Sequence, residues 1–187
     1  MQQFDFRSPK AFFERYLVDF QKIGLDWSEK DADWTHKNLE YFDKLGKSQG
    51  YKVWWQYGGG EYLVDLCWLV SGEQHYWMEL ALEQEWKGSF KDIEEDFFKL
   101  MDVKACLKVF VCFPYKHVIP DLPSRLAREI SRHKIKISDE AYLLIILSRD
   151  ASCRQAERLK VEGFGIDYRG SITPLGEKYF PDRVEVV

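Results

Sequence analysis

An acidic strand followed closely by a helix constrains this 187-residue sequence more than any other segment. Between Met78 and Glu85 apolar and polar residues alternate, which is the period of a strand with two different faces. One face carries Met78, Leu80 and Leu82, and the other carries Glu79, Ala81, Glu83 and Glu85. Neighbouring glutamates repel one another and raise one another's pKa, unless water bathes the face or a cation lies among them. The pattern therefore predicts either a solvated strand face or a cation site.

Capping and periodicity signals predict the elements on either side of this strand. Helices are expected over 8–24, from 31 or 33 to Gly46, after Ser89 and after Asp121. Strands are expected over 51–57, around Asp65, over 107–113 and over 141–147, with a turn at 71–74. The last forty residues are weakly patterned, and they are assigned only a short helix and an edge strand.

This order predicts an α/β (α+β) fold with a mixed sheet. The antiparallel hairpins come first, the later strands are joined by helical crossovers, and helices are expected on both faces. The length suits a single domain over 1–187, with a core at about 34–147, an N-terminal helix at 8–24 and a C-terminal elaboration at 148–187.

The composition is that of a soluble globular protein, with 45% hydrophobic and 31% charged residues. The longest apolar run, 141–147, is too short to cross a bilayer, and the first residues lack the pattern of a secretory signal. The four cysteines form no C-x-x-C pair and have no histidine cluster nearby, which favours reduced thiols over a zinc site or disulfides: Cys67, Cys106, Cys112 and Cys153. We therefore expect a cytoplasmic location and no membrane contact.

The element order and its carboxylates resemble the PD-(D/E)XK nuclease superfamily, which has the restriction-endonuclease-like fold. In that superfamily a helix precedes three antiparallel strands, a second helix and a further strand. An Asp on the second strand and a Glu on the third hold a metal ion. The resemblance covers roughly 34–147 and implies these roles for Asp65 and Glu79, which stand fourteen residues apart. Glu40, on the preceding helix, takes the place of a further acidic residue.

The sequence departs from the superfamily pattern at one important position. The pattern has a lysine two residues after the Glu, and this chain has Ala81 there. The lysine would orient the attacking water or stabilise charge on the phosphate, which a methyl group cannot do. Some members supply the lysine from the following helix, which implies this role for Lys99. Lys87 is a second candidate because it restores an E-x-K string further along the chain.

The register of the hairpin determines whether Asp65 meets the glutamates. A three-residue loop at 71–73 pairs Val70 with Gln74 and places Asp65 opposite Glu79 on the same face. A two-residue loop would instead place Asp65 opposite Leu80, on the apolar face and without a partner. The first register is therefore favoured.

The resemblance implies a nuclease that depends on Mg²⁺ or Mn²⁺ and hydrolyses phosphodiester bonds of DNA or RNA. Oxygen ligands that hold such a cation lower the pKa of its bound water and neutralise phosphate oxygens. The implied catalytic residues are Asp65, Glu79, Lys99 and Lys87. The implied metal ligands are Asp65, Glu79, Glu40 and Glu83.

Two further patterns bear on nucleic-acid binding. Arg125, Arg128 and Arg132 share one face of the helix after Asp121, where they could engage a phosphate backbone or simply form the solvated face of an amphipathic helix. Five tryptophans crowd the acidic hairpin and its neighbours: Trp54, Trp55, Trp68, Trp77 and Trp86. Most such residues pack in a core, whereas an exposed pair beside the carboxylates would suit stacking on bases.

Two other functions remain open at this point. Ala81 and the acidic pI of about 5.7 suit an inactive nuclease-fold module that binds a protein or a nucleic acid without cleaving it. The negative charge would also suit an immunity-type inhibitor of a basic toxin.

Overall fold

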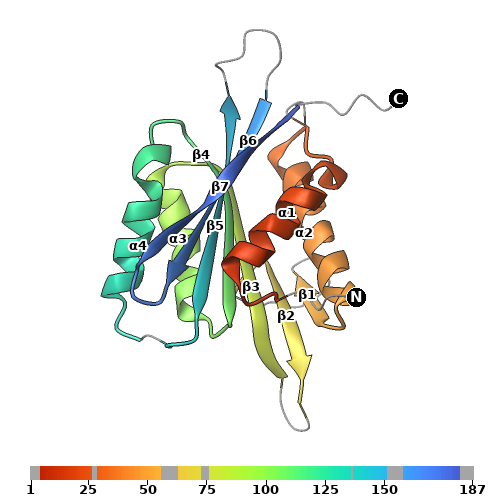
Figure 1. Cartoon of the computed structure of the whole chain (residues 1–187), viewed down its shortest axis with the longest axis vertical. Helices are drawn as coiled ribbons and strands as arrows, with labels where there is room; N and C mark the ends of the chain where they lie inside the picture. Colours follow the sequence, from red (N-terminus) through yellow and green to blue (C-terminus); the bar gives the residue numbers. More distant parts are fainter. Residues whose placement is uncertain are drawn as a thin grey trace.

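A mixed sheet runs through the middle of the molecule, and its strands lie side by side in chain order (Figure 1). The computed structural model describes residues 5–26, 29–55, 63–72, 76–135, 137–150 and 158–181. In this part of the chain the strands are β1 (Lys52–Trp55), β2 (Leu66–Ser71), β3 (Tyr76–Gly88), β4 (Leu107–Pro114), β5 (Ala141–Asp150), β6 (Arg158–Asp167) and β7 (Ile172–Pro181). The helices are α1 (Pro9–Ile23), α2 (Asp31–Ser48), α3 (Phe90–Asp102), the short 3₁₀ turn η2 (Ile119–Asp121) and α4 (Leu122–Arg132).

The strand directions divide the sheet into three parts. Strands β1, β2 and β3 pair antiparallel, as expected for the hairpins at the start of the sheet. Strands β3, β4 and β5 pair parallel, because α3 and α4 carry the chain back across the sheet between them. Strands β5, β6 and β7 are again antiparallel. The predicted mixed sheet of an α/β (α+β) fold is therefore confirmed.

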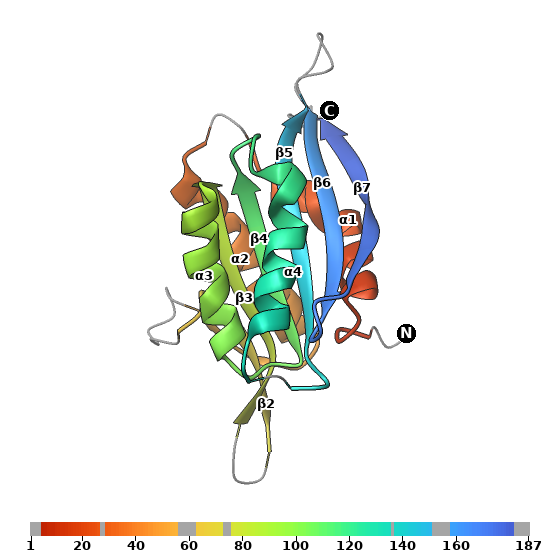
Figure 2. The ribbon, with the colours of Figure 1, turned by 90° about the vertical axis from the view of Figure 1, so that its left-hand side faces the viewer.

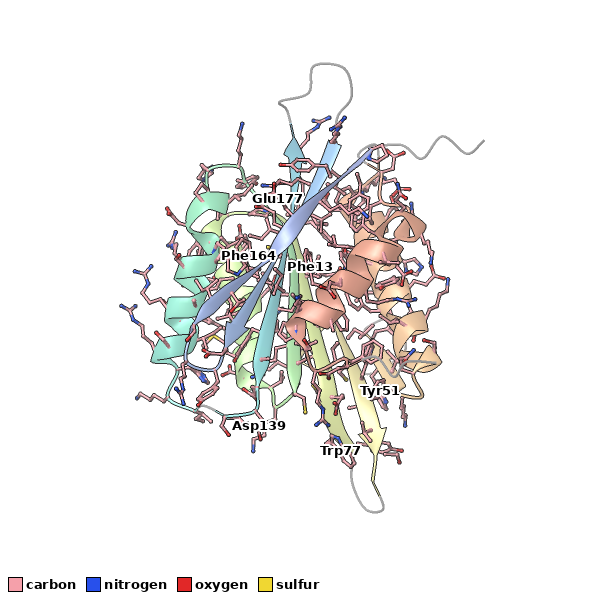
Figure 3. The ribbon with its side chains drawn as sticks, viewed as in Figure 1. Phe13, Tyr51, Trp77, Asp139, Phe164 and Glu177 are labelled. Atoms are coloured by element: carbon pink, nitrogen blue, oxygen red, sulfur yellow. The ribbon has the colours of Figure 1, made fainter. Side chains whose placement is uncertain are left out.

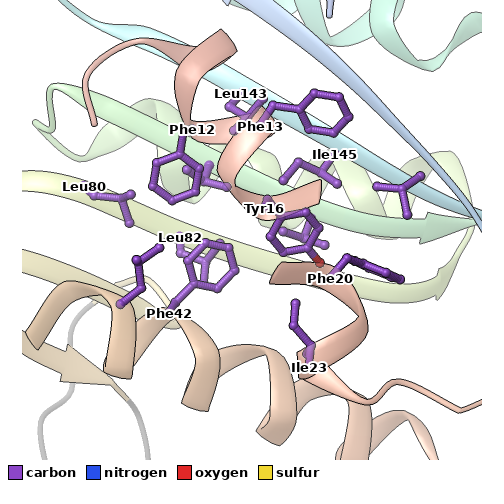
Figure 4. Close-up of a cluster of buried hydrophobic side chains, with 14 of the residues drawn as sticks. Phe12, Phe13, Tyr16, Phe20, Ile23, Phe42, Leu80, Leu82, Leu143 and Ile145 are labelled. Atoms are coloured by element: carbon purple, nitrogen blue, oxygen red, sulfur yellow. The ribbon is translucent and has the colours of Figure 1, made fainter. Parts of the chain in front are cut away.

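Helices cover both faces of the sheet, which gives three layers (Figures 1 and 2). Helices α1 and α2 pack on one face, where aromatic residues of α1 meet apolar residues of β3 and β5. Figure 4 shows this cluster, in which Phe12 and Tyr16 of α1 and Phe42 of α2 lie against Leu80 and Leu82 of β3. Helices α3 and α4 pack on the other face, over a second cluster built around Phe97, Phe110 and Leu126. Each face thus has its own core, and the sheet lies between them.

Two of the predicted helix starts are confirmed by their caps. The Ser8 hydroxyl accepts a hydrogen bond from the Ala11 N–H, and Gly24 ends α1 with a left-handed φ of 70°. Ser89 and Asp92 form a reciprocal capping box at the start of α3. These local signals fix where the helices that flank the sheet begin.

The predicted end of α2 at Gly46 is wrong, since the helix continues to Ser48. Gly46 lies inside α2 for a packing reason. A Cβ atom at this position would lie 2.5 Å from Nε1 of the buried Trp68, which is closer than two such atoms can approach. The glycine lets α2 lie against the indole ring of β2 instead of ending the helix.

Among the described residues near the C-terminus, no short helix is found. These residues form the two strands β6 and β7, and β7 lies at the end of the strand order, as expected for an edge strand. Alternate residues of β6 are buried, beginning with Leu159 and Val161. Gly163 continues the alternation, but it hides the pattern because it has no side chain. A Cβ there would lie 2.6 Å from the ring of Phe13, so α1 packs directly on the strand backbone at this glycine.

One ion pair is buried within the second core. Lys108 of β4 has a fully buried side chain, and its ammonium donates to Oε2 of Glu140 at 2.7 Å and to the Tyr142 hydroxyl at 3.2 Å. Burial lowers the pKa of Lys108, and the contact with Glu140 opposes that effect. This pair ties β4 to the start of β5.

Other expectations concern the cysteines and the membrane. Cys67, Cys106 and Cys112 are free thiols, while Cys153 lies outside the described residues. Among the helices that the structure describes, none combines the length and the apolar character that crossing a bilayer requires.

Candidate functional site

The register between β2 and β3 differs from the predicted one and gives Asp65 a different partner. Leu66 pairs with Leu82, so continuing the ladder brings Asp65 to Glu83 and not to Glu79. Val70 pairs with Trp77 and not with Gln74, which accounts for three residues of the shift. A β-bulge at Glu79 accounts for the fourth, because this residue has no partner on β2. The predicted register was therefore wrong, although Asp65 does meet an acidic residue of β3.

Two hydrogen bonds connect Asp65 to the acidic strand. The backbone N–H of Asp65 donates to Oε1 of Glu83 at 3.1 Å, and the backbone N–H of Gln84 donates to Oδ2 of Asp65 at 3.0 Å. Each carboxylate thus receives a backbone donor from the neighbouring strand. Like charges on neighbouring strands repel each other. The two backbone donors offset part of this repulsion and hold the two acidic side chains side by side.

Lys99 of α3 brings a positive charge to this pair. Its Nζ lies 3.7 Å from Oε2 of Glu83 and 2.6 Å from Oδ1 of Asp96. The side chain of Lys99 is 41% exposed, whereas that of Glu83 is 2% exposed. The ammonium group therefore lies at the surface end of a buried carboxylate, where it can reach both the carboxylate and an incoming ligand.

The position of α2 determines which residues of β3 face α3. The Gln84 side chain donates to the Thr35 carbonyl at 3.2 Å and accepts from Nδ2 of Asn38 at 2.9 Å. Trp86 donates to Oγ1 of Thr35 at 2.7 Å. Because β3 alternates, fixing these two residues toward α2 turns Glu83 and Glu85 toward α3.

The electrostatics of the site are those of crowded, buried carboxylates. Burial, reinforced by the charge of Asp65, raises the pKa of Glu83 to about 9. Burial also raises the pKa of Asp65 to about 6, against the opposing effects of the Gln84 N–H and of Lys99. The pKa of Glu85 rises to about 7, first through burial and then through its hydrogen bond with Asp96. Burial thus disfavours the ionised forms of all three carboxylates, and Lys99 opposes this effect only in part at Asp65 and Glu83.

Lys99 itself remains a strong base. Partial burial lowers its pKa, but the hydrogen bond to Asp96 and the nearby charge of Glu83 outweigh burial and raise the pKa above its usual value. Lys99 therefore stays an ammonium ion at neutral pH, able to donate hydrogen bonds but not to accept a proton.

The other predicted site residues lie elsewhere. Glu79 is buried and pairs with the guanidinium of Arg7, which also donates from Nη2 at 3.1 Å. Glu40 is on α2, across the sheet from α3, and pairs with Lys44 at 2.6 Å. The predicted convergence of Glu40, Asp65 and Glu79 is therefore wrong. The side chain of Lys87 lies outside what the structure describes.

The three arginines of α4 are placed away from this pair of carboxylates. Helix α4 lies on the β5 side of α3, whereas Asp65 is on the β2 side (Figure 2). The Arg125 guanidinium stacks over the ring of Phe90 with its carbon 3.2 Å from the ring centroid, and Arg132 pairs with Glu129 at 3.5 Å. Arg128 is exposed.

The donor set suits a magnesium-type cation with two protein ligands. Within the described ranges, no group of three or more His, Cys, Asp or Glu side chains is arranged to hold a metal ion. Asp65 and Glu83 nevertheless provide two adjoining carboxylates, and Mg²⁺ is typically held by one or two carboxylates, with waters and substrate phosphates completing its shell. Burial is the main cause of their raised pKa values, and a bound divalent cation would favour the ionised form of both carboxylates.

Sequence reasoning assigned Glu83 an auxiliary role and missed Glu85 and Asp96. A signal for them was present, because Glu83 and Glu85 share a strand face while Asp96 and Lys99 share a face of the next helix. The different turn and the bulge at Glu79 together hid which glutamate would reach Asp65. Comparison of the chain with models of known families, with curated proteins and with solved structures gave no match.

Proposed function

We propose that this protein is a metal-dependent nuclease that hydrolyses phosphodiester bonds, with Asp65 and Glu83 as metal ligands and Lys99 as the cation at the scissile phosphate. One observation carries the proposal: the Lys99 ammonium, from a different element, meets the buried Glu83 carboxylate beside Asp65. A lysine at that position is what distinguishes a catalytic arrangement from a merely acidic strand.

The resemblance to the PD-(D/E)XK superfamily supports this proposal in a revised form. The chain has a helix, three antiparallel strands, a helix and a parallel strand in that order. The Asp at the start of the second strand is Asp65, the Glu of the third strand is Glu83, and the lysine comes from the following helix. Glu85, two residues after Glu83, stands where the superfamily pattern has lysine.

The chemistry of these side chains suits phosphodiester hydrolysis. A bound Mg²⁺ or Mn²⁺ would supply a water of lowered pKa and charge neutralisation at the phosphate. Lys99 is a permanent donor near neutral pH, so it can hold a phosphate oxygen or orient a water molecule. Asp65 is mostly ionised at pH 7, whereas Glu83 retains its proton until a cation displaces it. A cytoplasmic location belongs to the same proposal.

An inactive nuclease-fold binding module is the second candidate. The arrangement of Asp65 and Glu83 without a third ligand in the described residues favours it, as does Glu85 at the position of the motif lysine. Such a module would still bind a divalent cation or a nucleic acid without cleaving it. The two candidates thus predict the same fold and differ in turnover.

Incubation with circular single-stranded DNA, plasmid DNA and RNA, in Mg²⁺ or Mn²⁺, tests the proposal. We expect Asp65→Asn, Glu83→Gln and Lys99→Met to lose cleavage by at least about a hundredfold. Glu40→Gln is the matched control. Glu40 is a partly exposed glutamate on the opposite face of the sheet, so this variant should leave cleavage unchanged. Cleavage that survives Asp65→Asn and Glu83→Gln would contradict the assignment. Cation binding without cleavage of any substrate would favour the binding module.

A further inference from the structure

An aromatic and basic strip lies at the β1 end of the sheet, beside the candidate site. It consists of Trp54 and Lys52 of β1 and Tyr76 at the start of β3, and we call it the edge strip. The Lys52 ammonium lies 5.2 Å from the ring centroid of Trp54 and 4.8 Å from that of Tyr76. The cation thus lies between two aromatic rings.

The strand register places the edge strip on the same face of the sheet as the carboxylates. Trp54 pairs with Cys67, two residues after Asp65. Lys52 pairs with Leu69 and Tyr76 with Ser71, which continue the same alternation along β2. Cys67 and Leu69 belong to the core under α3, so the shared face is the one that carries Glu83 and Lys99. Trp54 is therefore a diagonal neighbour of Asp65 across the β1–β2 pair.

The side chains of the edge strip are at least partly exposed to solvent. Tyr76 is 54% exposed, Lys52 is exposed and Trp54 is half-buried. Strand β1 is the first strand of the sheet, and the far ends of β2 and β3 project beyond the other strands (Figure 2). A chain lying along this edge could contact the strip and Asp65 at the same time.

The chemistry of the strip selects one class of nucleic acid. Aromatic rings on an open sheet stack on bases whose faces are free, and a lysine between them can meet the phosphate that links two such bases. A duplex conceals its base faces inside the helical stack, so it could use only the charge of Lys52. The aromatic rings of the strip should therefore favour a single strand over a duplex. The charge of Lys52 alone would not make this distinction, because both carry phosphates.

We propose that the edge strip binds single-stranded nucleic acid, stacking bases on Tyr76 and Trp54 and placing the next phosphodiester at Asp65, Glu83 and Lys99. This inference rests on the proposed function for the cleavage step, but the binding step can be measured separately. It names the substrate of the site as a single strand, or a single-stranded segment of a larger nucleic acid.

The test measures fluorescence anisotropy of a labelled twelve-nucleotide oligothymidylate and of a duplex of the same length, in EDTA so that cleavage does not interfere. We expect the single strand to bind more tightly than the duplex. Tyr76→Ala should weaken single-strand binding about tenfold, the factor that corresponds to a base-stacking contact of about 1.4 kcal/mol. Lys52→Gln should reduce the slope of log affinity against log salt by about 0.7, as for one phosphate contact on a single strand.

Trp77→Ala is the matched control. Trp77 follows Tyr76 on the same strand, lies near the projecting end of β3 (Figure 3) and is 49% exposed, but its side chain points to the other side of the strand. This variant should weaken binding by less than about twofold. Equal losses for Tyr76→Ala and Trp77→Ala, or equal affinity for the duplex, would overturn the inference. Thermal melts of both variants verify that each still folds.

The outcomes for binding and for cleavage are separable. Tyr76-dependent binding without hydrolysis under any metal would support the edge strip and contradict the nuclease. Hydrolysis that needs Glu83, combined with binding that ignores Tyr76, would support the nuclease and overturn the edge strip.

Discussion

The raised pKa of Glu83 implies that the site destabilises the fold above acidic pH. Burial and the charge of Asp65 raise this pKa from 4.5 to about 9. Between these two values the native state keeps a proton that the unfolded chain releases. The stability due to this group is therefore complete below pH 4.5 and is lost as pH rises toward 9. Replacing Glu83 by glutamine, which has the same shape and cannot ionise, should remove this dependence.

The size of the effect follows from proton linkage. One proton bound by the native state and not by the unfolded state changes the free energy of unfolding by about 1.36 kcal/mol per pH unit. Between pH 6 and pH 8 the wild-type protein should lose roughly 2–3 kcal/mol that Glu83→Gln retains. The burial of Glu83, 2% exposed, justifies using the full slope. Glutamine can still accept the Asp65 N–H, so the local geometry remains.

Urea unfolding of both proteins at pH 6, 7 and 8 measures this difference. Asp65 and Glu85 titrate in both proteins, so most of the difference between the two curves comes from Glu83 and its interaction with Asp65. We expect the variant to become progressively more stable than the wild type as pH rises, while losing any nuclease activity. If the two stability curves run parallel over this range, Glu83 is ionised in the native state and the electrostatic description of the site is incorrect.

Three further predictions concern the cation, the packing of α2 and the buried ion pair. Mg²⁺ binding at pH 7 should release about one proton per ion, since Glu83 is protonated before binding. Calorimetry in buffers of different ionisation enthalpy measures this release, and binding without proton release would contradict the prediction. Gly46→Ala should destabilise the protein by about 1–3 kcal/mol in urea, because its Cβ would lie 2.5 Å from Trp68; an unchanged midpoint would show that α2 can move aside. Lys108→Met should reduce the free energy of unfolding, measured in urea, by about 3–5 kcal/mol, because it leaves the Glu140 carboxylate buried without its cation. A loss below about 1 kcal/mol would show that water reaches this carboxylate.

Local signals in the sequence predict most of the fold. Ser8 and Ser89 mark helix starts through bonds that each hydroxyl makes within its own turn. The crossover helices and the parallel strands follow from spacing along the chain. Gly46 and Gly163 mislead because each is required by a side chain distant in sequence, Trp68 and Phe13. No local pattern contains that information.

In the candidate site, too, local patterns identify some residues, while contacts between residues distant in sequence determine the rest. Asp65 and Lys99 were identified from the sequence and lie on either side of Glu83. Glu79 was assigned as the partner of Asp65 because the assumed three-residue loop displaced the register by three residues, and the bulge at Glu79 displaced it by a fourth. Neither the true turn nor the bulge can be read from the alternation of the strand. Its actual partner, Arg7, comes from the N-terminal segment, 72 residues away in the chain.

The position of Lys99 on α3 makes the site a two-piece assembly. The carboxylates belong to the β2–β3 hairpin, while the ammonium group of Lys99 belongs to α3. Ile93, Phe97 and Leu100 pack this helix against the sheet. Lifting or tilting that helix by an ångström would separate the opposite charges while every residue of the hairpin stayed in place. The distance between Lys99 and Glu83 therefore depends on how α3 packs, and not on the hairpin alone.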